Sequence, residues 1–199
     1  MASLAHHFLT MAYNNAWANY RLLQACAQLS QAEFTAHRTN FFPSIKATYN
    51  HIVTVDWFYV DMLERAVQGR PPNLEAGRFF EPEEPFDTCA PLTEAQRAVD
   101  RRLITLCKAL TDAQLDDLVK VPRRDGVRTD RIGRILAHLF QHQIHHRGQV
   151  HAMLAGTPVK PPQLDEFFCA NEAHLRAAEL AELGLSEERI WAAPAAAGS

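Results

Sequence analysis

The sequence predicts an all-α protein, an up-and-down-type four-helix bundle with a minor hairpin before the fourth long helix and a C-terminal helical extension. Two observations predict this fold class. Glycine is scarce, with 8 residues in 199, and long stretches are rich in Ala, Leu, Gln, Glu and Arg, which favour helix. Four of these stretches carry apolar residues at helical spacing, and mostly modest connections join them, which is typical of a helical bundle.

The first two long helices are predicted from their apolar spacing and from their ends. The first extends over about residues 4–29. The second begins near Ser44, a helix-capping residue that follows a proline, and it ends near Gln68, where "GRPP" follows. Residues 70–91 are rich in proline and acids, so we expect a long extended connection with no core of its own.

The second half of the chain is predicted in the same way. A third helix covers residues 93–110, and "RDG" between two short valine-containing runs then predicts a hairpin turn. The fourth long helix covers about residues 131–154 and stops before Gly-Thr-Pro. A C-terminal helix is expected around residues 166–183, and "PAAAGS" is typical of a frayed tail.

Three stretches have Ser or Thr three residues before Glu or Gln, the capping-box spacing that satisfies free amides at a helix start. They are Ser30 with Glu33, Thr93 with Gln96, and Thr111 with Gln114. The spacing predicts a helix start at each of the three places.

Composition and charge exclude several classes of protein. The net charge of −3 argues against a protein that holds nucleic acid by its phosphates. The chain has no run of about 18 apolar residues to span a membrane and no pattern of a secretion signal, so we expect no membrane contact and a cytoplasmic location. The four cysteines are scattered and predict free thiols in a reducing compartment. We expect one main domain over residues 1–168 and a helical extension with a flexible tail over 169–199.

Five of the ten histidines lie between residues 138 and 151. On a helix with about 100° per residue, four of them and one glutamine fall on a single stripe, and His151 falls on the other side. The stripe consists of His138, His142, His145, His146 and Gln149. Because Ile135 and Met153 lie on it too, polar groups interrupt what is predicted to be the core-facing side, and such conflicts are expected at functional sites.

Two pairs in this stripe have the spacing of metal-binding histidines. His138 with His142 and His142 with His146 are four residues apart, so each pair projects side by side and can bind one cation. The glutamate of the H-E-x-x-H peptidase motif is absent. A third ligand must then come from another helix. The residues alone do not choose His51 over His37 or His6 for this role, and they leave open a network of hydrogen-bonded or solvated imidazoles that senses pH without any metal.

A resemblance to a known family bears on this choice. The stretches "YNNAWANYRLL", "SIKATYNHIVTVDWFYVDMLER" and "HLFQHQIHHRGQ", followed by "PPQLDEF", resemble in order those of the DinB family of small bacterial helical proteins. The resemblance covers about residues 8–168 and implies a four-helix bundle with one divalent ion per chain, nickel or zinc, held by His51, His142 and His146. It also implies a homodimer. The extra histidines and the C-terminal extension depart from the family's pattern. Because His138 is one of these extra histidines, His138 with His142 stays open as an alternative pair of metal ligands on this helix.

Enzymes of the wider DinB-like superfamily imply a first functional hypothesis, a metal-dependent transferase, isomerase or related hydrolase that uses a low-molecular-weight thiol. The alternative is a non-catalytic metal-binding or stress-response protein without turnover, because many members of the family have no assigned activity. No catalytic residue is identified from the sequence. Gln149 can support a ligand or form an ordinary core hydrogen bond, Asp56 and Arg147 are expected to form a salt bridge, and Trp17 and Trp57 are expected in the core.

Overall fold

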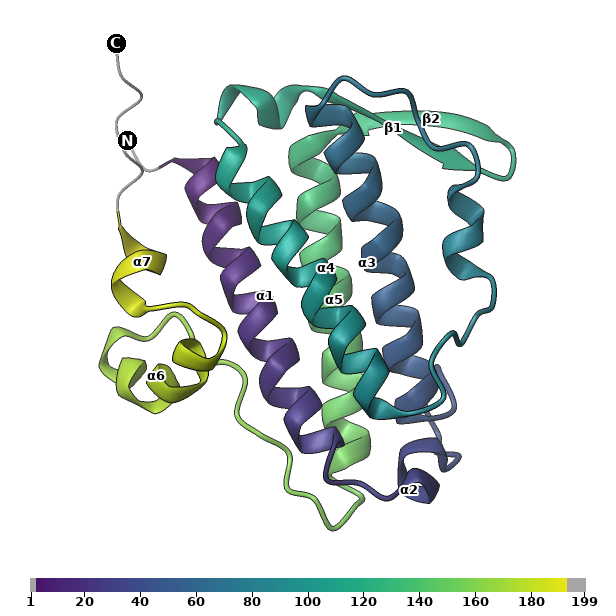
Figure 1. Cartoon of the computed structure of the whole chain (residues 1–199), viewed down its shortest axis with the longest axis vertical. Helices are drawn as coiled ribbons and strands as arrows, with labels where there is room; N and C mark the ends of the chain where they lie inside the picture. The colour runs from purple at the N-terminus through teal and green to yellow at the C-terminus, as the bar shows by residue number, and fades with distance from the viewer. Residues whose placement is uncertain (1–2, 193–199) are drawn as a thin grey trace.

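The computed structural model describes residues 3–192 and is mostly helical, with one small antiparallel sheet. Its helices, 3-10 turns and strands are α1 (Leu4–Cys26), α2 (Gln31–Thr35), α3 (Ile45–Val67), η1 (Ala76–Phe80), α4 (Cys89–Ala109), η2 (Ala113–Asp116), β1 (Leu118–Arg123), β2 (Gly126–Arg131), α5 (Ile132–Leu154), η3 (Ala170–Glu172), α6 (Ala173–Glu182) and α7 (Glu187–Trp191). Four of the helices, α1, α3, α4 and α5, are long and pack side by side (Figure 1).

The four long helices do not alternate in direction. α1 and α5 run one way, while α3 and α4 run the other way (Figure 1). Lys46, at the start of α3, pairs with Asp87 just before α4, so these two helices begin at the same end of the molecule. The expectation of an up-and-down arrangement therefore fails in this detail, because the connection between α3 and α4 returns along the outside before α4 begins.

Two of the three predicted capping boxes lie at a helix start, and one does not. Ser30 and Glu33 form a complete capping box at α2. Thr111 and Gln114 form the reciprocal bonds, but they open the short turn η2 rather than a long helix. α4 begins at Cys89, before Thr93, so the expected start at residue 93 lies inside the helix.

The connection between α3 and α4 contributes to the core, contrary to the expectation for residues 70–91. Ala76 in η1 is fully buried, and the Phe80 ring lies 5.3 Å from that of Phe58 on α3. The hairpin was predicted correctly: β1 pairs with β2 in antiparallel register, and Gly126 at the turn has a φ of 132°, which favours glycine. Both η1 and β1 contact α3, which also packs against α4 and α5.

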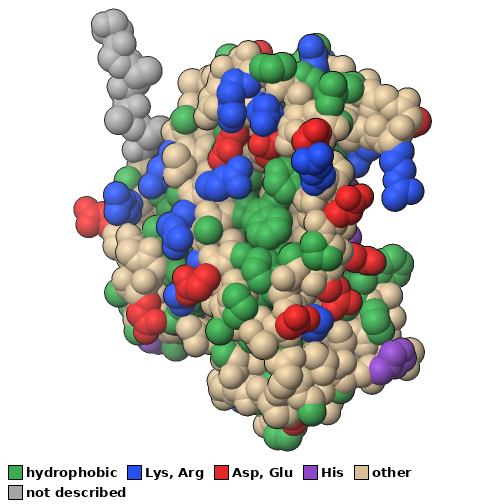
Figure 2. Space-filling view, turned by 45° about the vertical axis from the view of Figure 1, so that its right-hand side comes forward, with side chains coloured by type: hydrophobic (Ala, Val, Ile, Leu, Met, Phe, Trp, Pro, Cys, Tyr) green, Lys and Arg blue, Asp and Glu red, His purple; other side chains and the backbone are tan. Residues whose placement is uncertain are grey.

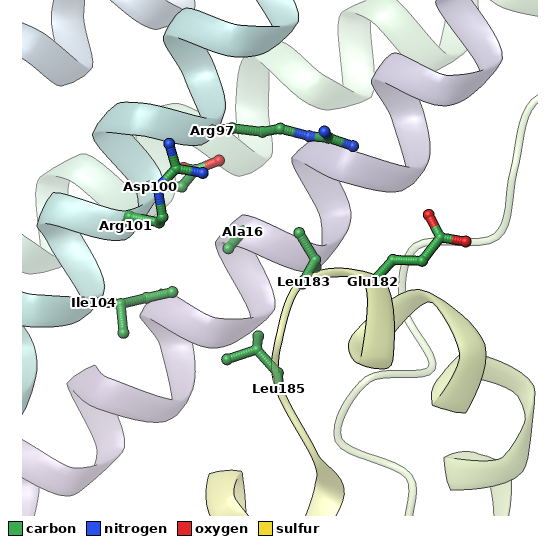
Figure 3. A pocket seen from close by; sticks show the side chains of 8 residues that line it. All are labelled: Ala16, Arg97, Asp100, Arg101, Ile104, Glu182, Leu183 and Leu185. Carbon is green, nitrogen blue, oxygen red and sulfur yellow. The ribbon is translucent and has the colours of Figure 1, made fainter.

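The C-terminal segment is less helical than predicted, but it packs tightly. α6 begins at Ala173 instead of residue 166, and a second short helix, α7, follows. Leu180 and Ile190 are buried in the same core as the long helices, and Glu179 accepts a hydrogen bond from Trp17 Nε1 at 2.7 Å. A small cavity of about 100 Å³ separates α1 and α4 from the turn after α6 (Figure 3), and it is lined by Ala16, Arg97, Asp100, Arg101, Ile104, Glu182, Leu183 and Leu185. The domain division at residue 168 stays a prediction, and the expected tail, residues 193–199, lies outside the described residues.

The surface carries charges of both signs. On the face seen in Figure 2, basic and acidic side chains are interspersed around a central apolar area. Within residues 3–192, every helix is too short or too polar to cross a membrane. The fold thus packs α3 against α5, and the predicted ligands lie in the first half of α3 and near the middle of α5.

Candidate metal centre

Three histidines from α3 and α5 meet between these neighbouring antiparallel helices. His51 lies in the first half of α3, while His142 and His146 lie one turn apart near the middle of α5. One ring nitrogen from each of the three lies within 4.8 Å of the others, and His51 Nε2 is 3.0 Å from His142 Nε2. His51 is therefore the histidine outside α5 that joins the cluster, and within the described residues neither His37 nor His6 belongs to it.

The geometry of these nitrogens fits a shared cation. Two imidazole nitrogens bound tetrahedrally at about 2.0–2.1 Å to one zinc ion lie roughly 3.3–3.4 Å apart, a few tenths of an ångström more than the 3.0 Å found between His51 Nε2 and His142 Nε2. His142 Nδ1 is buried and has no hydrogen-bond partner among the described residues. The same 3.0 Å separation also suits a hydrogen bond between one protonated and one unprotonated nitrogen, which is the arrangement expected without a metal.

Burial keeps the three imidazoles neutral. It lowers the pKa of His51 to about 4 and that of His142 to about 3, with a further lowering of both pKa values by the neighbouring histidines. The pKa of His146 is lowered as well, again chiefly by burial. At neutral pH all three rings are therefore unprotonated on one nitrogen, and a neutral imidazole is the form that binds a metal ion.

Gln149 holds His146 in the orientation that a ligand needs. Its side-chain oxygen lies 2.8 Å from His146 Nδ1 and accepts the hydrogen bond, so the proton of His146 is on Nδ1 and its Nε2 is left free. The amide nitrogen of Gln149 in turn donates to His145 Nε2 at 3.2 Å. Of the two roles considered for Gln149, the structure thus shows a contact with one of the proposed ligands.

We expect the substitution Gln149→Leu to weaken metal binding by about 10–100-fold, because loss of the hydrogen bond frees the ring orientation and the tautomer of His146. Competition with a chromophoric chelator measures this affinity. His145→Ala is the matched control on the same helix, since His145 is exposed and contacts Gln149 from the outside. Equal affinity of Gln149→Leu and the wild type would contradict this role.

The remaining histidines of the stripe lie at its solvent edge. His138 and His145 are exposed, whereas His146 is buried and His142 is half-buried, so the expectation of a wholly core-facing stripe was wrong. The helix packs one edge of the stripe against α3 and leaves the other edge in water. His151 lies on the other side as expected, where its Nε2 is 3.0 Å from the carbonyl oxygen of Pro162.

Phe42 is a site residue that the sequence analysis missed. Its ring lies 4.4 Å from the ring of His51 and 5.5 Å from that of His146, so it covers one side of the cluster. Phe42 belongs to the loop between α2 and α3, and no helical spacing connects it to the histidines. Loop residues carry no periodic signal, so only the fold brings this ring to the site.

The expected salt bridge between Asp56 and Arg147 does not form. Gln143 joins the two instead: its amide nitrogen donates to Asp56, and its oxygen accepts from Arg147 Nη1 at 3.1 Å. Both residues are buried at the centre of the long helices. The side-chain amide of Gln143 thus connects the Asp56 carboxyl group to the Arg147 guanidinium group, in place of a direct salt bridge between them.

This buried network extends across α1, α3, α4 and α5. Arg147 also donates to the side-chain oxygens of Asn15 and Asn19, whose amide nitrogens donate to Asp100. Burial raises the pKa of Asp56 to about 7, with the charge of Asp100 as the second cause, and burial raises the pKa of Asp100 to about 6. The network therefore has two carboxyl groups for one guanidinium group and holds protons near neutral pH.

The comparisons with known proteins agree with this fold. The model of a family described as the DinB family matches residues 2–179. The chain belongs to the DinB family. The uncharacterized protein YizA of Bacillus subtilis (strain 168) is 29% identical over 125 residues, which covers 63% of this chain and 72% of YizA. A crystal structure of a DinB-like protein from Bacillus cereus ATCC 10987 covers 78% of this chain and 94% of its own, with a TM-score of 0.59 and 18% sequence identity, and shows that the two share a fold.

Proposed function

We propose that this DinB-family chain is a metal-dependent transferase that attaches a low-molecular-weight thiol to an electrophile, with one nickel or zinc ion held by His51, His142 and His146. The observation that carries the proposal is the convergence of three neutral imidazoles from two helices on one point. Three protein ligands leave a coordination position free, as in catalytic rather than structural zinc sites.

A divalent ion bound there would lower the pKa of a thiol, so that the sulfur is a nucleophile at neutral pH. The residues around it have separate tasks. Gln149 fixes the proton of His146 on Nδ1, and Phe42 excludes water from the side of His51 and His146. The buried network of Asp56 and Arg147 holds α5 against the other long helices behind the histidines.

A test uses zinc-loaded protein, mercaptopropionate and monochlorobimane, an electrophile that becomes fluorescent when sulfur replaces its chloride. The thiol sulfur forms a bond to carbon, chloride leaves with the bonding electrons, and the thiol proton passes to the solvent. We expect a rate above the protein-free background in the wild type and the background rate in His142→Ala. His145→Ala, with its exposed imidazole removed, is the matched control and should keep the wild-type rate.

The alternative is a DinB-family protein that binds a metal ion without turnover. The position of Phe42 supports this alternative, because its ring covers two of the three imidazoles and restricts access to them. If protein that retains its metal ion gave only the protein-free reaction rate with several thiols and electrophiles, metal binding without turnover would be favoured over the transferase.

The other proposals about partners rest on the family resemblance. We propose that the chain is a cytoplasmic protein and forms a homodimer of four-helix bundles, as the family resemblance implies. We also propose that it binds a small thiol rather than nucleic acid or a membrane. Sedimentation equilibrium tests the dimer: a mass close to twice that of one 22.4 kDa chain supports it, and a single-chain mass contradicts it.

A further inference from the structure

A row of four side chains leads from the three histidines along α3 and α5 to the hairpin. The row consists of Arg123, Tyr59, His138 and His142. Arg123 Nη2 donates to the Tyr59 hydroxyl at 3.1 Å, the Tyr59 ring lies edge-on to His138 at 5.2 Å, and the His138 ring lies 6.3 Å from that of His142. His138 thus lies between one proposed ligand and a cationic side chain.

The row lies at the end of the cluster that Phe42 does not cover. Phe42 lies beside His51 and His146, and the neighbouring Asn40 approaches the backbone oxygen of Gln149 at 3.4 Å. His138, by contrast, is exposed and has no hydrogen bond to another described residue. His138 is therefore open to solvent at the end of the cluster away from Phe42.

Arg123 carries a positive charge that no described carboxylate neutralises. Within residues 3–192 it forms no ion pair, and the nearby Asp125 pairs instead with Arg128 at 2.6 Å. The guanidinium is held in place by Tyr59 and lies 5.5 Å from the Phe58 ring centre, although the residue is exposed. A guanidinium has five N–H donors, so most of them remain free, and its planar fork matches a carboxylate.

We propose that the row binds the carboxylate end of a small thiol whose sulfur lies at the three histidines. This inference rests on the proposed function and specifies its substrate class. Tyr59 lies two helical turns beyond His51 on α3, about 12 Å along the axis, so the substrate must be extended enough to bridge the two ends. His138 lines the path between them.

The test is isothermal titration calorimetry of zinc-loaded protein with two matched thiols, mercaptohexanoate and mercaptohexanol, which differ in the charge at the far end. A hydrogen-bonded ion pair with Arg123 predicts that the wild type binds mercaptohexanoate about tenfold more tightly. Arg123→Gln should abolish this preference without changing the binding of mercaptohexanol, and Arg123→Lys should restore part of it. Mercaptopropionate is too short to bridge the row, so its affinity should not depend on Arg123.

Arg38→Gln is the matched control. Arg38 is the arginine on the covered side, where it lines a cavity of about 440 Å³ together with His145 and Gln149. Retention of the preference in Arg38→Gln and its loss in Arg123→Gln would support the row. The row would be overturned if the wild type bound mercaptohexanoate and mercaptohexanol equally, or if only Arg38→Gln lost the preference. It would also be overturned if Arg123→Gln weakened the binding of mercaptopropionate as much as that of mercaptohexanoate. If no thiol binds to protein that retains its zinc, the proposed function fails as well.

Discussion

Replacing Arg147 with methionine is expected to lower the free energy of unfolding by about 3–5 kcal/mol, because it removes the buried guanidinium charge that offsets the two carboxyl groups through the intervening side-chain amides. Arg147 is 5% exposed, and its donors also satisfy the oxygens of Asn15, Asn19 and Gln143. Loss of these bonds leaves three buried amide oxygens without a donor, which adds to the cost. Urea unfolding followed by circular dichroism measures the change.

Arg134→Met provides the control for this prediction. Arg134 is on the same helix, its side chain is 77% exposed, and its ion pair with Asp130 at 3.5 Å lies at the surface. Surface pairs of this kind contribute at most about 1 kcal/mol. A similar small effect of Arg147→Met would mean that the buried network contributes little to stability.

Asp56→Asn is expected to be more stable than the wild type at pH 8, and its stability relative to the wild type should rise by about 4 kcal/mol from pH 4 to pH 8. The folded protein holds a proton on Asp56 up to a pKa of about 7, whereas the unfolded chain releases it near 3.8. The stability that this proton gives is complete below pH 3.8 and is lost as the pH rises through 7. An asparagine keeps the hydrogen-bonding oxygen for Gln96 and Gln143 and carries no charge to bury.

The difference between the variant and the wild type is the quantity to follow in unfolding curves from pH 4 to pH 8. The lowered pKa values of His51, His142 and His146 change stability in the opposite direction, since their contribution is lost as the pH falls, but they cancel in this difference. Asp116→Asn, at a side chain that is 76% exposed, is the surface control for this difference. A difference that stays constant from pH 4 to pH 8 would contradict a proton on Asp56.

Regular spacing made the long helices predictable, and irregular segments were not. The ends of α3 followed from Ser44 as a cap and from the "GRPP" that comes after it. The start of α4 was predicted wrongly. Thr93 and Gln96 have capping-box spacing but lie inside the helix, where Gln96 is buried and donates a hydrogen bond to Asp56. The direction of α4 depends on the path of the preceding connection, which local sequence does not encode.

The candidate site was predictable where helical spacing and family resemblance acted together. The spacing placed His142 and His146 on one side of α5, and the resemblance selected His51, which the structure brings to the same point. Phe42 and Arg123 were not predicted, because a loop and a hairpin end bring them near the histidines through the fold alone. The missing salt bridge of Asp56 and Arg147 has a similar cause, since Gln143 lies between them only in the packed protein.

The metal content of the untagged protein, purified without nickel chromatography, is the most direct test of the metal centre. Mass spectrometry of bound metals should find about one divalent ion per chain in the wild type and in His138→Ala, and none in His51→Ala or His142→Ala. Metal retained without His51, or lost in His138→Ala, would contradict the assignment of the three ligands. A wild type that is empty and also fails to take up added zinc or nickel would leave the cluster as a hydrogen-bonded network without a metal ion.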